Sequence, residues 1–249
     1  MRLVLVHGFT QTHRSWDPLL PHLARDHEVI AIDAPGHGRS DGVELDLVEG
    51  GAWLAAAGGR ATYVGYSMGG RLCLHAALAA PDAVRGLVLI SATGGIDDDA
   101  ERDARRAADD ALADRVEHIG VAAFLDEWLA QPLFAGLTAE TSGRAERLEN
   151  TAAGLASSLR HAGAGTQAPL WDRLGELTMP VLVIAGADDA KFVALAARFV
   201  AALPRAELAV IDGAGHTVHL EQPDAFLAVL DRWLRDHDDS ASPTATSAP

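Results

Sequence analysis

The sequence contains a single cysteine, Cys73, among its 249 residues. One cysteine excludes a framework of internal disulfides, so we expect a cytosolic protein in which Cys73 is a small buried side chain. Long apolar runs are also missing, because charges or glycines interrupt every alanine-rich stretch before the roughly 20 residues that span a bilayer. The apolar start at residues 1–6 reaches His7 and Gly8 too early for a signal peptide. We therefore predict a strand there and no membrane insertion.

Basic residues are scarce. The chain has 20 Lys and Arg residues against 35 Asp and Glu residues, which gives a formal net charge of −15. Because nucleic-acid binding depends on clustered Lys and Arg, this balance argues against a nucleic-acid partner. The 11 histidines are scattered, and His216 and His219 lack the spacing of a helical metal motif. We expect no metal ion, and nothing in the sequence implies an organic cofactor.

Short β-rich segments alternate with longer helical ones along most of the chain. The predicted strands are residues 3–6, 29–32, 61–64, 87–90, 181–185 and 208–211, and the predicted helices include residues 72–80, 192–202 and 225–234. The strands are almost continuously apolar, as expected of a parallel sheet that helices cover on both faces. The alternation predicts an α/β fold with a mostly parallel sheet.

This alternation is interrupted between residues 94 and 169, where charged helical stretches such as residues 100–117 replace the strands. The length suits one domain that carries an insertion. We predict an α/β core from residues 1–93 and 170–235, with residues 94–169 as a helical cap. Residues 236–249 are rich in Asp, Ser, Ala, Pro and Thr and have little to bury, so we expect a disordered tail.

Residues 65–69 read Gly-Tyr-Ser-Met-Gly, a G-x-S-x-G motif between the predicted strand at 61–64 and the helix that follows. Small residues on either side allow a sharp strand-to-helix turn that exposes the Ser67 hydroxyl at the positive end of a helix. An isolated match fits a glycine-rich turn with a capping serine equally well. The partners of Ser67 decide between these alternatives.

A catalytic serine needs a base, and the base needs an orienting carboxylate, in the chain order serine, acid, histidine. Asp189 follows the strand predicted at 181–185, at the end of the sheet where α/β folds build their sites, and Asp188 is the competing acid. His216 lies in a glycine-containing loop after the next strand. Taken singly, an aspartate here could be a helix N-cap and a histidine could be a surface loop residue. Their ordered combination predicts a triad of Ser67, Asp189 and His216.

Residues 7–10, His-Gly-Phe-Thr, follow the first predicted strand. The glycine lets the backbone turn, so that the amide of Phe9 can point toward the serine. The amides of Phe9 and Met68 are therefore the predicted oxyanion hole. His37 lies in a turn-forming segment rich in Gly and Pro, and we expect it to be structural rather than catalytic.

Together these motifs resemble the α/β-hydrolase superfamily and, within it, the 2-succinyl-6-hydroxy-2,4-cyclohexadiene-1-carboxylate synthases of menaquinone biosynthesis. The resemblance covers nearly the whole chain except the tail. It rests on residues 65–71, 127–134, 186–192 and 215–223. The G-x-S-x-G and Gly-His pieces are common among hydrolases, whereas the runs at 128–134 and 189–192 are more selective.

The resemblance implies a carbon–oxygen lyase whose triad acts as a base on 2-succinyl-5-enolpyruvyl-6-hydroxy-3-cyclohexene-1-carboxylate and expels pyruvate without an acyl-enzyme. It also implies that Arg71, Arg105 and Arg147 hold the carboxylates of this substrate, and that Tyr66 and Trp128 line the pocket. Guanidinium groups suit carboxylates. The alternative with the same triad is an esterase or carbon–carbon bond hydrolase that uses a serine nucleophile.

Helical spacing places Arg71 one turn beyond Ser67, on the same helix face. Arg105 lies among other charged residues, so a solvated helix face explains it equally well. A substrate with several carboxylates needs compensating charge, so we expect a locally basic pocket in this acidic protein. The expected partner is a small polycarboxylate, bound by a monomer or weak oligomer.

The sequence departs from the family pattern in two places. It starts at the strand before His7, without the usual preceding strand pair, and residues 41–59 are short for the usual helix of this region. Both differences fall at the edge or the outer face of the sheet. We therefore expect them to affect stability and association more than the site.

Overall fold

The computed structural model describes residues 1–237, and residues 238–249 of the tail expected at 236–249 lie outside them. Six parallel strands form one sheet in the order β2-β1-β3-β4-β5-β6. They are β1 (Arg2–Val6), β2 (Glu28–Ile32), β3 (Ala61–Tyr66), β4 (Val84–Ile90), β5 (Val181–Gly186) and β6 (Ala206–Ile211). The predicted α/β fold with a parallel sheet is confirmed, and each strand contains the segment predicted from its apolar run.

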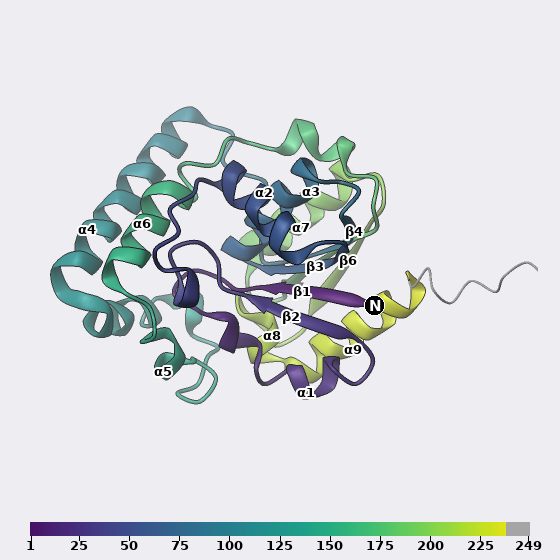
Figure 1. Cartoon of the computed structure of the whole chain (residues 1–249), viewed down its shortest axis with the longest axis horizontal. Coiled ribbons are helices and arrows are strands. Elements are labelled where there is room, and N and C mark those ends of the chain that lie inside the picture. The colour runs from purple at the N-terminus through teal and green to yellow at the C-terminus, as the bar shows by residue number, and fades with distance from the viewer. Residues whose placement is uncertain (238–249) are drawn as a thin grey trace, which may run out of the picture.

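Helices cover both faces of this sheet (Figure 1). Helices α2 (Leu47–Gly58), α3 (Met68–Ala79) and α7 (Ala190–Ala202) pack on one face, and α1 (Leu20–Leu23) and α9 (Pro223–Asp236) on the other. The side chains of β1 alternate between the two layers, since Val4 and Val6 join the first and Leu3 and Leu5 the second. Apolar side chains on both faces explain why the central strands read as continuous apolar runs.

The remaining short elements are η1 (His13–Trp16), η2 (Gly38–Ser40), η4 (Trp171–Glu176) and α8 (Val218–Glu221). Cys73 is fully buried in α3, as predicted. No helix within residues 1–237 combines the length and the apolar character that a membrane span requires.

Three expectations need correction. The edge strand β6 is not covered on both faces, because Leu208 and Val210 are 43% and 42% exposed. The segment 41–59 is long enough for a helix of 12 residues: the Asp46 side chain accepts from the Val48 and Glu49 amides in a capping box, which starts α2 at Leu47. The predicted tail begins too early, since α9 runs through Asp236.

The chain between β4 and β5 holds α4 (Asp99–Leu129), η3 (Pro132–Phe134), α5 (Arg144–Arg147) and α6 (Ala152–Ala162). Helices α4 and α6 pack together through a small apolar cluster of their own that includes Val116, Phe124 and Leu155. They stand beside the carboxyl ends of the strands (Figure 1). The broad helical segment therefore lies next to the edge of the sheet where parallel strands place functional loops.

Candidate active site

Ser67 occupies the turn between β3 and α3 in a strained conformation, with φ 51° and ψ −109°. The neighbouring glycines make this turn possible. A Cβ atom on Gly65 would lie 2.5 Å from the Gly69 carbonyl oxygen, and one on Gly69 would lie 2.2 Å from the carbonyl oxygen of Val6. Both approaches are to backbone atoms, so a side chain at either position would displace the turn. The spacing of the motif thus holds Ser67 in a conformation that costs energy by itself.

The structure joins Ser67, His216 and Asp189 in one chain of hydrogen bonds. His216 Nε2 lies 3.3 Å from Ser67 Oγ, and His216 Nδ1 lies 3.0 Å from Asp189 Oδ2. Burial alone would raise the pKa of Asp189, but the hydrogen bonds from His216 and from the Phe192 amide outweigh it and lower that pKa. Asp189 is therefore ionised at neutral pH and able to stabilise a protonated His216. The competing side chain, Asp188, is exposed.

Glu221, for which the sequence predicted no role, fixes the loop that carries His216. The carboxylate of Glu221 accepts from the amide of Gly215 at 2.6 Å and from the amide of Thr217 at 2.7 Å. These two amides flank His216 on either side. Glu221 belongs to no motif that would predict this role. The one signal in the sequence is its position five residues after His216.

The loop after β1 presents the backbone amide of Phe9. The carbonyl oxygen of Gly8 accepts from the His7 ring at 2.8 Å and from the Gln11 amide at 3.1 Å. Because the carbonyl and the N–H of a trans peptide point in opposite directions, anchoring this oxygen also sets the direction of the Phe9 N–H. Met68 is the first residue of α3, where backbone amides lack helical partners. The two amides are available to an oxyanion at the cavity that both residues line.

Two side chains, His37 and Asn150, hold the backbone on either side of Thr10 in this loop. Thr10, which has a positive φ of 67°, donates its amide to His37 Nε2 at 3.2 Å. Asn150 donates to the Thr10 carbonyl at 2.7 Å and accepts from the Gly38 amide at 2.9 Å. Asn150 had no signal in the sequence, because Gly38 and Thr10 lie more than 100 positions away from it.

Arg147 holds the same loop. Its Nη1 contacts the Thr10 hydroxyl and lies 3.4 Å from the carbonyl oxygen of Phe9, while Nε donates to the Ser142 carbonyl at 2.7 Å. The side chain is buried, and burial lowers the Arg147 pKa to about 10. Two of its three guanidinium nitrogens thus contact the protein. The sequence predicted only substrate binding for Arg147.

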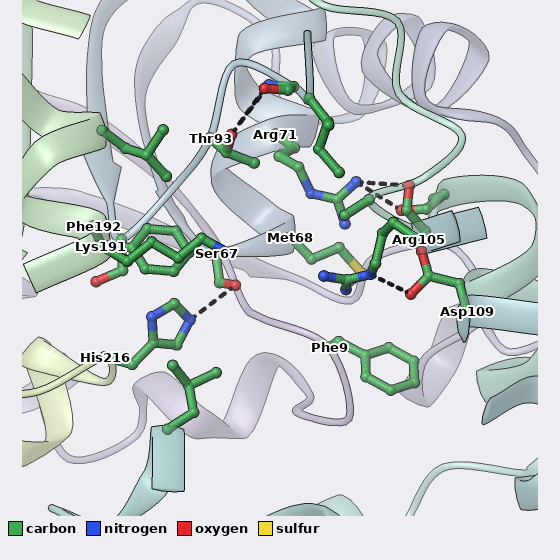
Figure 2. A pocket seen from close by; sticks show the side chains of 18 of the residues that line it. Phe9, Ser67, Met68, Arg71, Thr93, Arg105, Asp109, Lys191, Phe192 and His216 are labelled. Carbon is green, nitrogen blue, oxygen red and sulfur yellow. Dashed lines mark hydrogen bonds and ion pairs between the residues drawn. The ribbon is translucent and has the colours of Figure 1, made fainter. Parts of the chain in front are cut away.

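These elements surround a cavity of about 640 Å³ (Figure 2). Its lining includes every residue that the sequence predicted for the site except Asp189: Phe9, Tyr66, Ser67, Met68, Arg71, Arg105, Trp128, Arg147 and His216. The Tyr66 hydroxyl lies 3.0 Å from that of Thr217, and burial raises the pKa of Tyr66. Trp128 packs edge-to-face on Phe9, with ring centroids 5.1 Å apart.

Arg71 and Arg105 approach the cavity differently. Arg71 is 7% exposed, and its Nη1 donates to the carbonyl oxygens of Ala162 and Gly163 at 2.8 and 3.2 Å. Burial and, to a smaller extent, the positive charge of Arg105 lower the Arg71 pKa to about 10. The Arg105 side chain is 43% exposed and pairs with the buried Asp109 at 2.8 Å. Arg105 is therefore both a cavity residue and part of a solvated, charge-paired helix.

The charge of the cavity wall is nearly balanced. Its five cationic side chains are Arg71, Arg105, Arg147, Lys191 and Arg198, and its four carboxylates are Asp97, Asp98, Glu101 and Asp109. Asp97 pairs with Arg198 as Asp109 does with Arg105. The wall is one charge positive in a chain whose net charge is −15. The pocket is thus much less acidic than the protein, but only weakly basic by count.

Residues 3–229 match the alpha/beta hydrolase family. The chain belongs to this family. Within it, the chain is 36% identical to a Bacillus subtilis (strain 168) protein that is provisionally named a 2-succinyl-6-hydroxy-2,4-cyclohexadiene-1-carboxylate synthase, over 93% of this chain and 89% of that protein. It is 34% identical to the Serratia proteamaculans (strain 568) synthase of the same name, over 93% and 92% of the two chains.

Among solved structures of this hydrolase family, MenH from S. aureus superposes with a TM-score of 0.89 at 31% identity. The match covers 95% of this chain and 94% of that one. The resemblance to these synthases that the sequence motifs indicated is confirmed. The chain is an enzyme of the α/β-hydrolase fold.

Proposed function

We propose that this enzyme eliminates pyruvate from 2-succinyl-5-enolpyruvyl-6-hydroxy-3-cyclohexene-1-carboxylate to give 2-succinyl-6-hydroxy-2,4-cyclohexadiene-1-carboxylate in menaquinone biosynthesis. The observation that carries the proposal is the hydrogen-bonded chain Ser67-His216-Asp189, which opens on a cavity with three arginines in its wall, in a chain similar to synthases of that name. The substrate carries three carboxylates, which suit such a wall.

In the proposed reaction the triad works as a base. Ser67 Oγ takes the proton from the ring carbon that bears the succinyl group while its own proton passes to His216 Nε2, 3.3 Å away. The electron pair of the C–H bond forms a new ring double bond, the existing double bond shifts by one position, and the C–O bond to the enolpyruvyl group breaks. Enolpyruvate leaves and becomes pyruvate on protonation at carbon.

The charge that develops in this step falls on the succinyl carbonyl oxygen. The amides of Phe9 and Met68 are the proposed donors to that oxygen, and removing such a donor typically costs about 10²- to 10³-fold in rate. Asp189 stabilises the imidazolium of His216 while the proton is held there. We also propose that residues 94–169 act as a cap that supplies Arg105, Trp128 and Arg147 to the cavity.

A direct assay tests the proposal: the enzyme is mixed with the enolpyruvyl substrate, and pyruvate is followed through coupled reduction by NADH. Pyruvate and the cyclohexadiene product should appear in equal amounts, without a burst, and Ser67→Ala should abolish both. Absence of pyruvate release would reject the lyase. An acyl group found on Ser67 with this substrate would instead support the alternative, an esterase or carbon–carbon bond hydrolase.

The proposal includes a small polycarboxylate as the partner, no nucleic acid, and a cytoplasmic monomer or weak oligomer. The acidic composition supports the absence of a nucleic-acid partner, because a polyanionic nucleic acid needs clustered cations. Sedimentation velocity over a concentration series would test the state of association.

A further inference from the structure

Lys191 is the only lysine in the chain, and the other 19 of the 20 strongly basic residues are arginines. This single lysine lines the cavity of the candidate active site, in the first turn of α7 and two residues beyond Asp189. Lysine and arginine are not interchangeable, because an ammonium group is a compact charge on a flexible stem with three donors. A chain that uses arginine everywhere else thus carries its one ammonium side chain at the site.

The ammonium group of Lys191 makes few interactions within the part of the chain that the structure describes. Within residues 1–237 its ammonium group makes no ion pair or hydrogen bond. Its charge helps to lower the pKa of Asp189, and Nζ lies 5.7 Å from the centroid of the Phe192 ring. The other four cations of the cavity wall all donate to protein oxygens. A cation in the first turn of a helix is also disfavoured by the helix dipole. The charge is therefore free to meet a ligand.

Its position complements the arginines. Figure 2 shows Arg71 and Arg105 on one side of Ser67 and Lys191 with Phe192 on the other. Phe192 packs against the His216 ring, with centroids 4.5 Å apart, so this wall of the cavity adjoins the triad. A molecule with several carboxylates that extends across Ser67 would place one of them on the α7 side. Arg198 of α7 also lines the cavity, but it pairs with Asp97.

We propose that Lys191 is a substrate-binding residue that pairs with one carboxylate of a polycarboxylate on the α7 side of the cavity. This inference rests on the proposed function only for the identity of that polycarboxylate. An exposed ammonium contributes little in the empty cavity, and its attraction grows once a bound molecule excludes water from around the pair.

Kinetics of Lys191→Met provide the first test, with Arg205→Met as the control. Arg205 follows α7, is exposed, does not line the cavity, and carries the same charge. Lys191→Met should raise KM for the enolpyruvyl substrate about tenfold or more, with kcat within about threefold, as expected for loss of ground-state binding. Arg205→Met should leave both constants unchanged. A loss of kcat at constant KM would mean that Lys191 acts through Asp189 and would overturn the binding role.

The second test uses the fact that no other lysine is present. N-hydroxysuccinimide esters acetylate amines preferentially, and Lys191 carries the only side-chain amine in the chain. Peptide mass spectrometry separates acetylation of Lys191 from that of the terminal amine and of hydroxyl groups such as that of Ser67. Tricarballylate, a simple tricarboxylate, should slow acetylation of Lys191 at least fivefold relative to sodium chloride of equal ionic strength, while the terminal amine reacts at one rate in both. Equal rates at Lys191 would overturn the proposal.

These two tests separate the inference from the proposed function. If the wild-type enzyme releases no pyruvate but tricarballylate still protects Lys191, the lyase fails and the carboxylate site stands. If pyruvate is released but neither KM nor protection responds at Lys191, the lyase stands and the role of this lysine is wrong. Reductive methylation, which keeps the positive charge, should leave KM within about threefold, whereas acetylation should raise it as Lys191→Met does.

Discussion

Replacing Arg71 by Met removes a buried guanidinium from the cavity while keeping an unbranched side chain of similar length. The wild-type side chain is 7% exposed and spans from α3 to the carboxyl end of α6, where Nη1 donates to the carbonyls of Ala162 and Gly163. Its pKa of about 10 keeps it charged at neutral pH, although burial has lowered that pKa. Arg71 therefore offers its remaining donors to a bound carboxylate as a charged group.

The size of the effect follows from this burial. Truncating one partner of a buried, charge-assisted pair costs about 2 to 5 kcal/mol, and an exposed pair costs about 0 to 1 kcal/mol. We expect kcat/KM of Arg71→Met to fall by about 30- to 4000-fold, since each 1.4 kcal/mol is tenfold. Arg105→Met should cost less than about 1 kcal/mol, because the Arg105 side chain is 43% exposed. Its partner Asp109 still accepts a hydrogen bond from the Gly165 amide at 3.0 Å in this variant.

Steady-state kinetics of pyruvate release measure these losses, and urea unfolding of each variant tests whether stability changes as well. Arg106→Met is the matched control, since Arg106 is exposed on the same helix as Arg105 and does not line the cavity. Small, equal losses at Arg71, Arg105 and Arg106 would refute the reasoning. They would show that the buried guanidinium is a structural link between α3 and α6 and does not hold the substrate.

Three further outcomes are expected. Ser67→Ala and Asp189→Asn should each lower kcat by about 10⁴-fold, and the double variant by hardly more, whereas Asp188→Asn should stay within about threefold; reversed results for the two aspartates would assign the wrong acid. Asn150→Asp removes the donor to the Thr10 carbonyl, so kcat should fall about tenfold or more at similar KM in steady-state kinetics, and an unchanged kcat would contradict a positioning role. His219 is buried, and neither ring nitrogen has a hydrogen-bond partner within residues 1–237, so His219→Phe should stabilise the protein to urea by about 1 to 3 kcal/mol at pH 7. Burial lowers the His219 pKa to about 3, so the unfolded chain binds the extra proton below pH 6.5; wild type should lose about 1.4 kcal/mol per pH unit on acidification from this group, and an equal pH slope in the variant would contradict it.

The fold was predictable because its signals are local. The apolar runs of β1, β3, β4 and β5 have both faces buried, so their composition alone marks them as central strands. The runs of the edge strands β2 and β6 look similar, and the exposure of Leu208 and Val210 depends on what packs against β6. The helix at residues 47–58 forms although its segment is short, because the capping box of Asp46 and Glu49 fixes its first turn.

For the site, the sequence by itself determined the elbow and the order of the triad. The strained turn at Ser67 needs glycines at positions 65 and 69 because backbone atoms lie within about 2.5 Å of where their Cβ atoms would be, and neighbouring residues along the chain encode that requirement. Only the tertiary structure decided which buried groups meet. Arg147 reaches Thr10 across 137 positions and Asn150 across 140. Such pairings depend on how the segment with α5 and α6 packs against the loops of the sheet. Side-chain contacts along one strand or helix repeat with a fixed period that a sequence reveals, but contacts between distant segments have no such period.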